Sequence, residues 1–237
     1  MKALILSDVH ANILALEAIW AKESDSDLIL CCGDVVDYGL YPREVLAWLR
    51  VHNAHCVQGN HDAWVARQYR EGNTLETVAP GEGLWAHYAA GLLDEADVQY
   101  LENLPRGMTV EVDGLLYGMT HLYREYNEIV SLHAYHAFTA ELFDQTTPGT
   151  ITRMLMGHTH RQGVRYLADD VLWVNPGSVS YRRHDDPDQA AHYATITDGK
   201  ISLRRVEYDV TPLYRAVQSL RLKQSELDVA NFFFGPR

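Results

Sequence analysis

The N-terminal stretch MKALILSDVHANILALEAIWAKESDSDLILCCGDVVDYG, residues 1–39, decides the fold class. Two continuous apolar runs, residues 3–6 and 28–32, each end in a short polar turn. Between them, residues 12–22 place apolar side chains at helical spacing. Strands without polar alternation are typical of a sheet that is covered on both faces. The stretch therefore predicts a β-α-β unit of an α/β fold.

The same rhythm continues further along the chain. Residues 42–50 are predicted to form a helix with proline in its first turn, and residues 54–57 a third short strand. Residues 63–105 are mainly helical in pattern and are interrupted by Gly and Pro, which predicts a helical insert. Later strand pairs flank Asp113-Gly114 and Asp198-Gly199, and residues 211–229 are predicted to form a C-terminal helix. We interpret residues 1–237 as a single domain.

The composition argues against two kinds of partner. The formal net charge is −12, whereas a protein that coats duplex nucleic acid needs a basic face. No apolar run reaches membrane-spanning length, and no signal-peptide pattern opens the sequence. The three cysteines form no CxxC pair and are interpreted as buried thiols of a reducing compartment. We expect a cytoplasmic protein that binds neither duplex nucleic acid nor a membrane.

Polar residues of the metal-ligand type cluster at the predicted strand ends. Five of them follow apolar runs, namely Asp8, Asp34, Asn60, His121 and His158. In an open sheet with helices on both faces, ligands bind outside the carboxyl ends of the strands. We therefore expect side chains from five separate strand exits to converge in one crevice.

Two of these positions have a histidine nearby. His10 lies two residues after Asp8, and His160 two residues after His158, which gives seven candidate ligands. Seven exceed the four of a closed zinc site and are enough for two ions with open positions. A mixture of carboxylate, imidazole and amide ligands suits Mn, Fe or Zn. Each motif alone fits an ordinary turn or cap equally well, but their combination favours a metal site.

Five motifs, in this order, resemble those of the calcineurin-like metallophosphoesterases, in particular small bacterial and archaeal phosphodiesterases and phosphatases. They are SDVH (7–10), GDVVD (33–37), GNHD (59–62), TH (120–121) and GHTH (157–160), within about residues 1–180. The resemblance implies an α/β fold: a four-layer α-β-β-α sandwich of two mixed sheets flanked by helices. It also implies two transition-metal ions (Mn, Fe or Zn). The first would be held by Asp8, His10, Asp34 and His160, and the second by Asp34, Asn60, His121 and His158.

The same resemblance implies two catalytic residues. His61 would face the scissile ester and protonate the leaving oxygen instead of binding metal. Asp37 would orient His61, as carboxylates behind a histidine often do, although a solvated turn is an equally good interpretation of Asp37. Two close cations lower the pKa of a bridging water, so hydroxide attack on phosphorus is the predicted reaction.

One departure from the related protein phosphatases bears on the substrate. Those enzymes carry Asp-Arg-Gly where this chain has Asp37-Tyr38-Gly39. Without that arginine as a fixed phosphate donor, a phosphodiester or nucleotide polyphosphate is favoured, with a dinucleoside polyphosphate as the leading hypothesis. The alternatives are a phosphomonoesterase, including a protein phosphatase, and a non-catalytic scaffold organised by metal.

The residues that would contact a small phosphoester or nucleotide substrate are less sharply defined. The candidates are Tyr38, Arg67, Tyr123 and Arg124. Aromatic residues of the insert are interpreted either as part of this surface or as helix core. A basic spot at residues 182–184 is either a further contact or simply solvated. The apolar tail at residues 232–234 either docks on the core or forms a subunit contact, so a homo-oligomer stays open.

Overall fold

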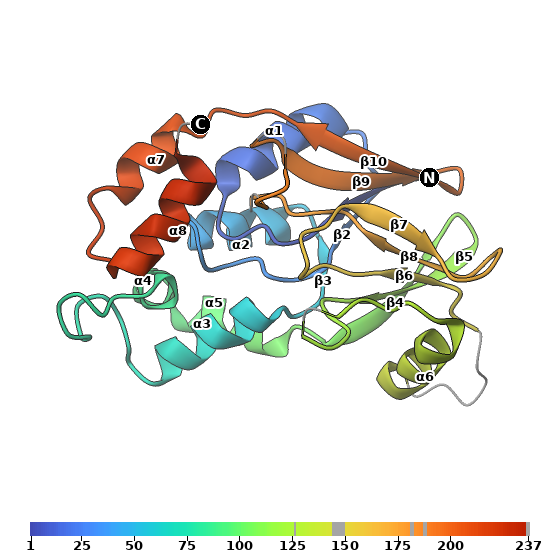
Figure 1. Cartoon of the computed structure of the whole chain (residues 1–237), viewed down its shortest axis with the longest axis horizontal. Helices are drawn as coiled ribbons and strands as arrows, with labels where there is room; N and C mark the ends of the chain where they lie inside the picture. Colours follow the sequence, from blue (N-terminus) through green and yellow to red (C-terminus); the bar gives the residue numbers. More distant parts are fainter. Residues whose placement is uncertain (126, 144–149, 181–182, 187–188, 236–237) are drawn as a thin grey trace.

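The computed structural model describes residues 1–125, 127–143, 150–180, 183–186 and 189–235. Among these residues, ten strands form two five-stranded mixed sheets (Figure 1). The order in the first sheet is β10 (Lys200–Val206), β9 (Ala191–Thr197), β1 (Lys2–Leu6), β2 (Leu28–Cys31) and β3 (His55–Cys56). The order in the second is β4 (Gly107–Val112), β5 (Leu115–Thr120), β6 (Arg153–Leu155), β8 (Leu172–Asn175) and β7 (Gly163–Tyr166). Strands β1, β2 and β3 are parallel, as are β5, β6 and β8.

Helices cover the outer face of each sheet (Figure 1). The first sheet is covered by α1 (Ile13–Glu23), α2 (Pro42–Val51), α3 (Asn60–Arg70), α4 (Trp85–Leu92) and α5 (Glu95–Asn103). The second sheet is covered by α6 (Leu132–Leu142). Two further helices, α7 (Thr211–Val217) and α8 (Gln224–Phe234), lie at the end of the molecule remote from the N-terminus. The layers are therefore α-β-β-α.

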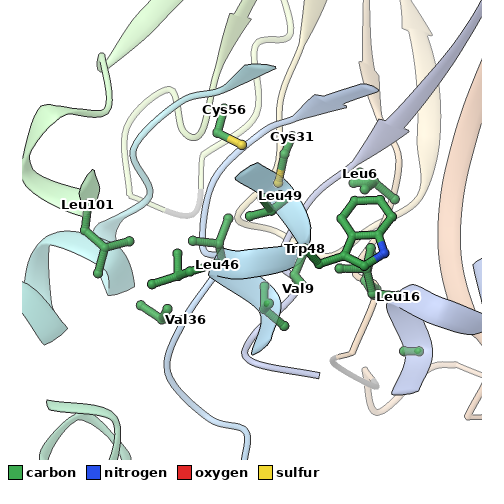
Figure 2. Close-up of a cluster of buried hydrophobic side chains, with 14 of the residues drawn as sticks. Leu6, Val9, Leu16, Cys31, Val36, Leu46, Trp48, Leu49, Cys56 and Leu101 are labelled. Atoms are coloured by element: carbon green, nitrogen blue, oxygen red, sulfur yellow. The ribbon is translucent and has the colours of Figure 1, made fainter. Parts of the chain in front are cut away.

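The continuous apolar strands supply both faces of the first sheet. Leu4 and Leu6 of β1 pack among the helices, whereas Ala3 and Ile5 face the second sheet. Figure 2 shows the helix side of this core, where Leu6 and other sheet residues lie against side chains of α1 and α2. Because successive side chains of a strand point to opposite faces, a strand buried on both faces has to be apolar at every position. The predicted fold class is confirmed.

The C-terminal segment differs from its prediction. Residues 211–229 were expected to form one helix, but α7 ends at Val217 and α8 begins at Gln224. Between them, Leu222 is buried and the backbone N–H of Lys223 donates to the carbonyl of Gly83, at 2.7 Å. These tertiary contacts outweigh the helical periodicity, which extends through the break. The single-helix prediction is therefore wrong.

The break folds α7 and α8 against each other and onto the body of the chain. Phe233 and Phe234 are buried, with 4% and 2% of their surface exposed, in a cluster with Trp85 and Leu213. Of the two interpretations of the apolar tail, docking on the core is the one that the structure shows. Among the described residues, no helix combines the length and apolar character needed to cross a bilayer.

Candidate metal centre and active site

The predicted ligands lie at the carboxyl ends of neighbouring strands. Asp8 follows β1 and Asp34 follows β2, while Asn60 begins α3 just after β3. In the second sheet, His121 follows β5 and His158 follows β6. The parallel strands within each sheet end on the same side, so both sheets present their polar turns to one region.

Six of these side chains form two compact groups. In each group, the ligand-type nitrogen and oxygen atoms lie within 4.8 Å of one another. The groups are Asp8, His10 and His160, and Asp34, His121 and His158. Asn60 joins the second group, because its Oδ1 lies 3.0 Å from Nε2 of His121. The structure therefore brings all seven predicted ligands together.

The backbone at this site adopts an unfavourable conformation. Twelve described non-glycine residues have positive φ, and eight of them lie in, or directly after, the motifs around the two groups. They are Asp8, His10, Ala11, Asp34, Asp37, Tyr38, His158 and His160. Asp and His tolerate this region better than most residues, but Ala and Tyr do not. Such strain concentrates at functional sites, where the surrounding structure enforces it.

The turns also approach each other too closely for a side chain at several glycines, two of which lie directly against the ligands. A Cβ at Gly157 would lie 1.9 Å from Oγ of Ser7 and 2.9 Å from a carboxylate oxygen of Asp8. A Cβ at Gly59 would lie 2.0 Å from Oδ1 of Asp34. The glycines of the GHTH and GNHD motifs thus allow turns of different strands to meet at the ligands.

Hydrogen bonds orient His121 as metal-binding histidines are usually oriented. Nδ1 contacts the carbonyl of Cys32 at 2.7 Å, which makes Nδ1 the donor and directs Nε2 inward. There Nε2 faces two oxygens, Oδ2 of Asp34 at 3.1 Å and Oδ1 of Asn60 at 3.0 Å. A nitrogen lone pair directed at two acceptors is stable only with a positive charge between them, either a proton or a cation. The donor set therefore fits a metal ion.

The ionisation of the other ligands is consistent with this fit. Burial lowers the pKa of His10 to about 3, and burial with nearby His121 lowers that of His158 to about 4. Both rings are therefore neutral near pH 7, as a metal ligand must be. Burial acts to raise the pKa of Asp34, but the adjacent His121 ring outweighs it and holds the carboxylate ionised. His121 differs: burial acts to lower its pKa, but the Asp34 carboxylate outweighs it and raises the pKa to about 9, so a metal ion would have to displace a proton from this ring.

His61 and Asp37 form a hydrogen-bonded pair next to the ligands. Nδ1 of His61 lies 2.7 Å from Oδ2 of Asp37, and the ring of Tyr38 packs edge-on against His61 at 4.8 Å. Burial acts to lower the pKa of His61, but the hydrogen bond that the ring donates to Asp37 and the charge of Asp34 outweigh it and raise the pKa to about 9. His61 therefore carries a proton at neutral pH. Asp37 is bonded to the ring and is no solvated turn residue.

Asp62 is a site residue to which the sequence analysis gave no role. Its carboxylate is fully buried and accepts four backbone N–H groups, from Asp34 (3.0 Å), Val35 (2.8 Å), Val36 (3.1 Å) and Gly59 (2.9 Å). It thus connects the GDVVD turn to the start of α3. Burial and the charge of Asp34 raise its pKa to about 6. The available signal was an acidic residue at the third position of a helix, as in a capping box.

Replacing Asp62 with alanine is expected to destabilise the fold markedly. Four buried N–H groups would lose their acceptor, so the free energy of unfolding should fall by about 3–5 kcal/mol. Asp94→Ala is the matched control, because Asp94 caps α5 by accepting one backbone N–H, and about 1 kcal/mol is expected. Urea denaturation of both variants measures the difference. Equal losses would show that Asp62 is only an ordinary cap.

The ligand groups open into a cavity of about 790 Å³. Its inner lining includes His10, Asp34, His61, His158 and His160. A second cavity of about 400 Å³ adjoins the first at Tyr38 and His61, which line both. The smaller cavity is also lined by Asn60, Asp37, Trp64 and Glu226. His61 thus lines two spaces that both reach the candidate metal ligands.

The four predicted substrate contacts differ in their position relative to the two cavities. Tyr38 lines both cavities. Tyr123 packs against Phe138 of α6, with ring centroids 5.0 Å apart, and Arg124 is exposed beside it. Arg67 is also exposed, next to Trp64. Trp64 lines the smaller cavity, whereas Arg67 lines neither cavity.

The basic residues that follow the turn at residues 175–180 lie at the larger cavity. Arg183 and His184 line the larger cavity, whereas Arg182 lies outside the described residues. Arg183 donates to the carbonyl of Thr159 at 2.8 Å and to Asp185 at 2.8 Å. Among the described residues that line this cavity, Arg183 is the only Arg or Lys. Its pairing with Asp185 partly neutralises it.

A four-layer sandwich with Asp, His and Asn at its strand ends defines the metallophosphoesterase class of proteins. Residues 1–198 match the family model of the calcineurin-like phosphoesterase superfamily domain, and the chain belongs to this family. The family resemblance inferred from the five motifs is confirmed.

Individual relatives agree with this assignment. An uncharacterised protein of Methanocaldococcus jannaschii is 26% identical over 238 residues, which cover 93% of each chain. The crystal structure of a metallophosphoesterase from Sphaerobacter thermophilus is 26% identical, covers 100% of both chains and has a TM-score of 0.73. A hypothetical protein from Pyrococcus horikoshii has a TM-score of 0.76 at 17% identity, over 100% of this chain and 99% of that one, and shares the fold.

Proposed function

We propose that the protein is a phosphoester hydrolase that uses two metal ions. The observation that carries this proposal is the convergence of seven ligand side chains with a protonated His61 in one cavity. A fold needs neither feature for its stability. A non-catalytic scaffold would not require His61 and Asp37 to be paired beside a complete ligand set.

Each candidate residue has a proposed role. Asp8, His10 and His160 would hold one ion, while Asn60, His121 and His158 would hold the other. Asp34 would bind both, since one oxygen lies near His121 and its carboxylate lies beside His10 in the cavity lining. Mn, Fe and Zn all accept such ligands. When bound, the two cations would neutralise charge on the phosphoryl oxygens and activate water.

The chain itself would supply the proton for the leaving group. His61 is protonated at neutral pH and faces both cavities, so it can donate to an ester oxygen as that bond breaks. Asp37 would hold the ring orientation through Nδ1, which leaves Nε2 as the donor. The buried Asp62 would keep the Asp34 turn and α3 in register.

Two observations favour a phosphodiester or a nucleotide phosphate ester over a phosphomonoester. The two cavities that adjoin at His61 can accept two ester substituents, and a monoester has only one. In addition, Tyr38 stands where a protein phosphatase has arginine, and Arg183, the only arginine among the described residues that line the larger cavity, is paired with Asp185. A monoester dianion carries more charge than a diester and would need more positive partners.

The Mn²⁺-loaded protein is therefore expected to hydrolyse bis-p-nitrophenyl phosphate in a metal-dependent reaction. Its kcat/KM should exceed that for p-nitrophenyl phosphate by about tenfold, equivalent to about 1.4 kcal/mol. Release of p-nitrophenolate, with and without a chelator, measures both. Preference for the monoester would favour the phosphatase alternative. A metal-loaded protein that cleaves neither compound nor any nucleotide would support the scaffold alternative.

A further inference from the structure

Helix α8 forms one wall of the larger cavity. Asp228, Val229, Phe232 and Phe233 of α8 line the same cavity as the histidines of the candidate metal centre. This helix lies outside residues 1–198, which match the family model. The catalytic motifs of the family therefore do not determine what this wall contacts.

Several contacts fix α8 on the body of the protein. Nε1 of Trp85 donates to the carbonyl of Glu226 at 3.3 Å. The side chain of Gln189 donates to the carbonyls of Phe233 and Gly235 at 3.0 and 2.9 Å. The buried ring of Phe234 adds apolar packing. The wall is thus a fixed part of the fold.

Aromatic rings line the wall continuously from His61 outward. Tyr38 lies 4.8 Å from His61 and 6.3 Å from Phe233, measured between ring centroids. Phe232 lies 5.6 Å from Phe233 and 4.2 Å from the ring of His184. Phe232 is half-buried and lines the cavity, so its ring is accessible from that space. Such surfaces bind flat aromatic groups by stacking or edge contacts.

The charges along this wall disfavour a second phosphate. Asp185 and Asp228 both line the cavity, and the guanidinium of Arg183 is already paired with Asp185. Among the described lining residues, an extended polyphosphate would meet two carboxylates and one partly neutralised cation. A neutral ring would meet apolar surface.

We propose that the α8 wall binds an aromatic substituent of the substrate, such as a nucleobase or an aryl group, attached to a single phosphoryl group at the metal centre. This inference rests on the proposed function, because it takes the phosphoryl group to bind at the candidate ligands. It narrows the substrate class to aromatic phosphodiesters and disfavours long polyphosphates.

The test is a binding experiment that needs no turnover. Phenylphosphonate and methylphosphonate carry the same charged group, but only phenylphosphonate has an aromatic ring. Calorimetry with the Mn²⁺-loaded protein is expected to show about tenfold tighter binding of phenylphosphonate, a typical gain for ring stacking. Phe232→Ala should remove most of this preference, and Phe232→Tyr, which keeps the ring, should retain it.

Phe143→Ala is the matched control, because Phe143 is also half-buried but packs beside Gly118 on the other sheet. Thermal unfolding of each variant shows whether α8 remains folded. Equal affinity of the two phosphonates for the wild type would overturn the inference, as would loss of the preference in Trp64→Ala but not in Phe232→Ala. Either result would overturn the binding of an aromatic ring at α8 but not metal-dependent hydrolysis. If hydrolysis were absent, the preference for phenylphosphonate could still be measured by calorimetry.

Discussion

Asp34→Asn is expected to reduce kcat/KM by about 10³-fold or more, because one carboxylate is proposed to bind both metal ions. Its Oδ1 accepts the backbone N–H of His61 at 2.8 Å, and its Oδ2 lies 3.1 Å from Nε2 of His121. Asparagine keeps the shape but replaces one oxygen with a donor. Metal should therefore no longer raise the melting temperature, as a ligand that binds only the folded state otherwise does.

Asp97→Asn provides the matched control for Asp34→Asn. Asp97 of α5 is also a buried carboxylate. It pairs with Arg50 of α2 at 2.8 Å and lines neither cavity. Its variant should keep metal-dependent stabilisation and activity. Calorimetric titration with Mn²⁺ and differential scanning fluorimetry report on binding directly. If Asp34→Asn still bound two ions with activity within tenfold of the wild type, the bridging role would be wrong.

His61→Ala should have a different signature, with kcat lowered by about 10²–10⁴-fold and metal content unchanged. The side chain of His61 belongs to neither ligand group and contacts Asp37 instead. Its loss would remove the proton donor but no metal ligand. Steady-state kinetics and metal analysis of the same preparation separate the two effects.

The control for His61→Ala is His52→Ala. His52 stacks on Trp48 with ring centroids 4.1 Å apart and does not line either cavity. A substrate with a good leaving group, such as p-nitrophenolate, should be less affected by His61→Ala than one with an alkoxide leaving group, because it needs less protonation. Reduced metal binding in His61→Ala would show that this histidine acts as a ligand.

The strands and the ligand set were predictable because each left a local signal. A strand buried on both faces must be apolar throughout, so Ala3, Leu4, Ile5 and Leu6 form an unbroken run. Ligand-type residues directly after such runs had to lie at strand ends. The pairing of His61 with Asp37 was implied only by the family resemblance, and the sequence alone left a solvated turn equally open for Asp37.

The features that sequence analysis missed depend on tertiary contacts. The break between α7 and α8 arises from burial of Leu222 and a hydrogen bond to Gly83, 140 residues earlier. The same break positions α8 at the cavity, which no local pattern indicates. The contact of Arg67 with substrate stays a prediction: Arg67 lies over the ring of Trp64, which lines the smaller cavity, but lines neither cavity itself.

The left-handed residues around the metal ligands have a consequence for protein engineering. A non-glycine residue in that region costs about 1 kcal/mol or more relative to glycine. Random mutagenesis selected for heat resistance alone would therefore reward glycine at positions such as Asp8, Asp34 and His158. Thermostable clones from such a screen would lose metal binding early. A directed-evolution campaign on this protein should therefore select for turnover in every round.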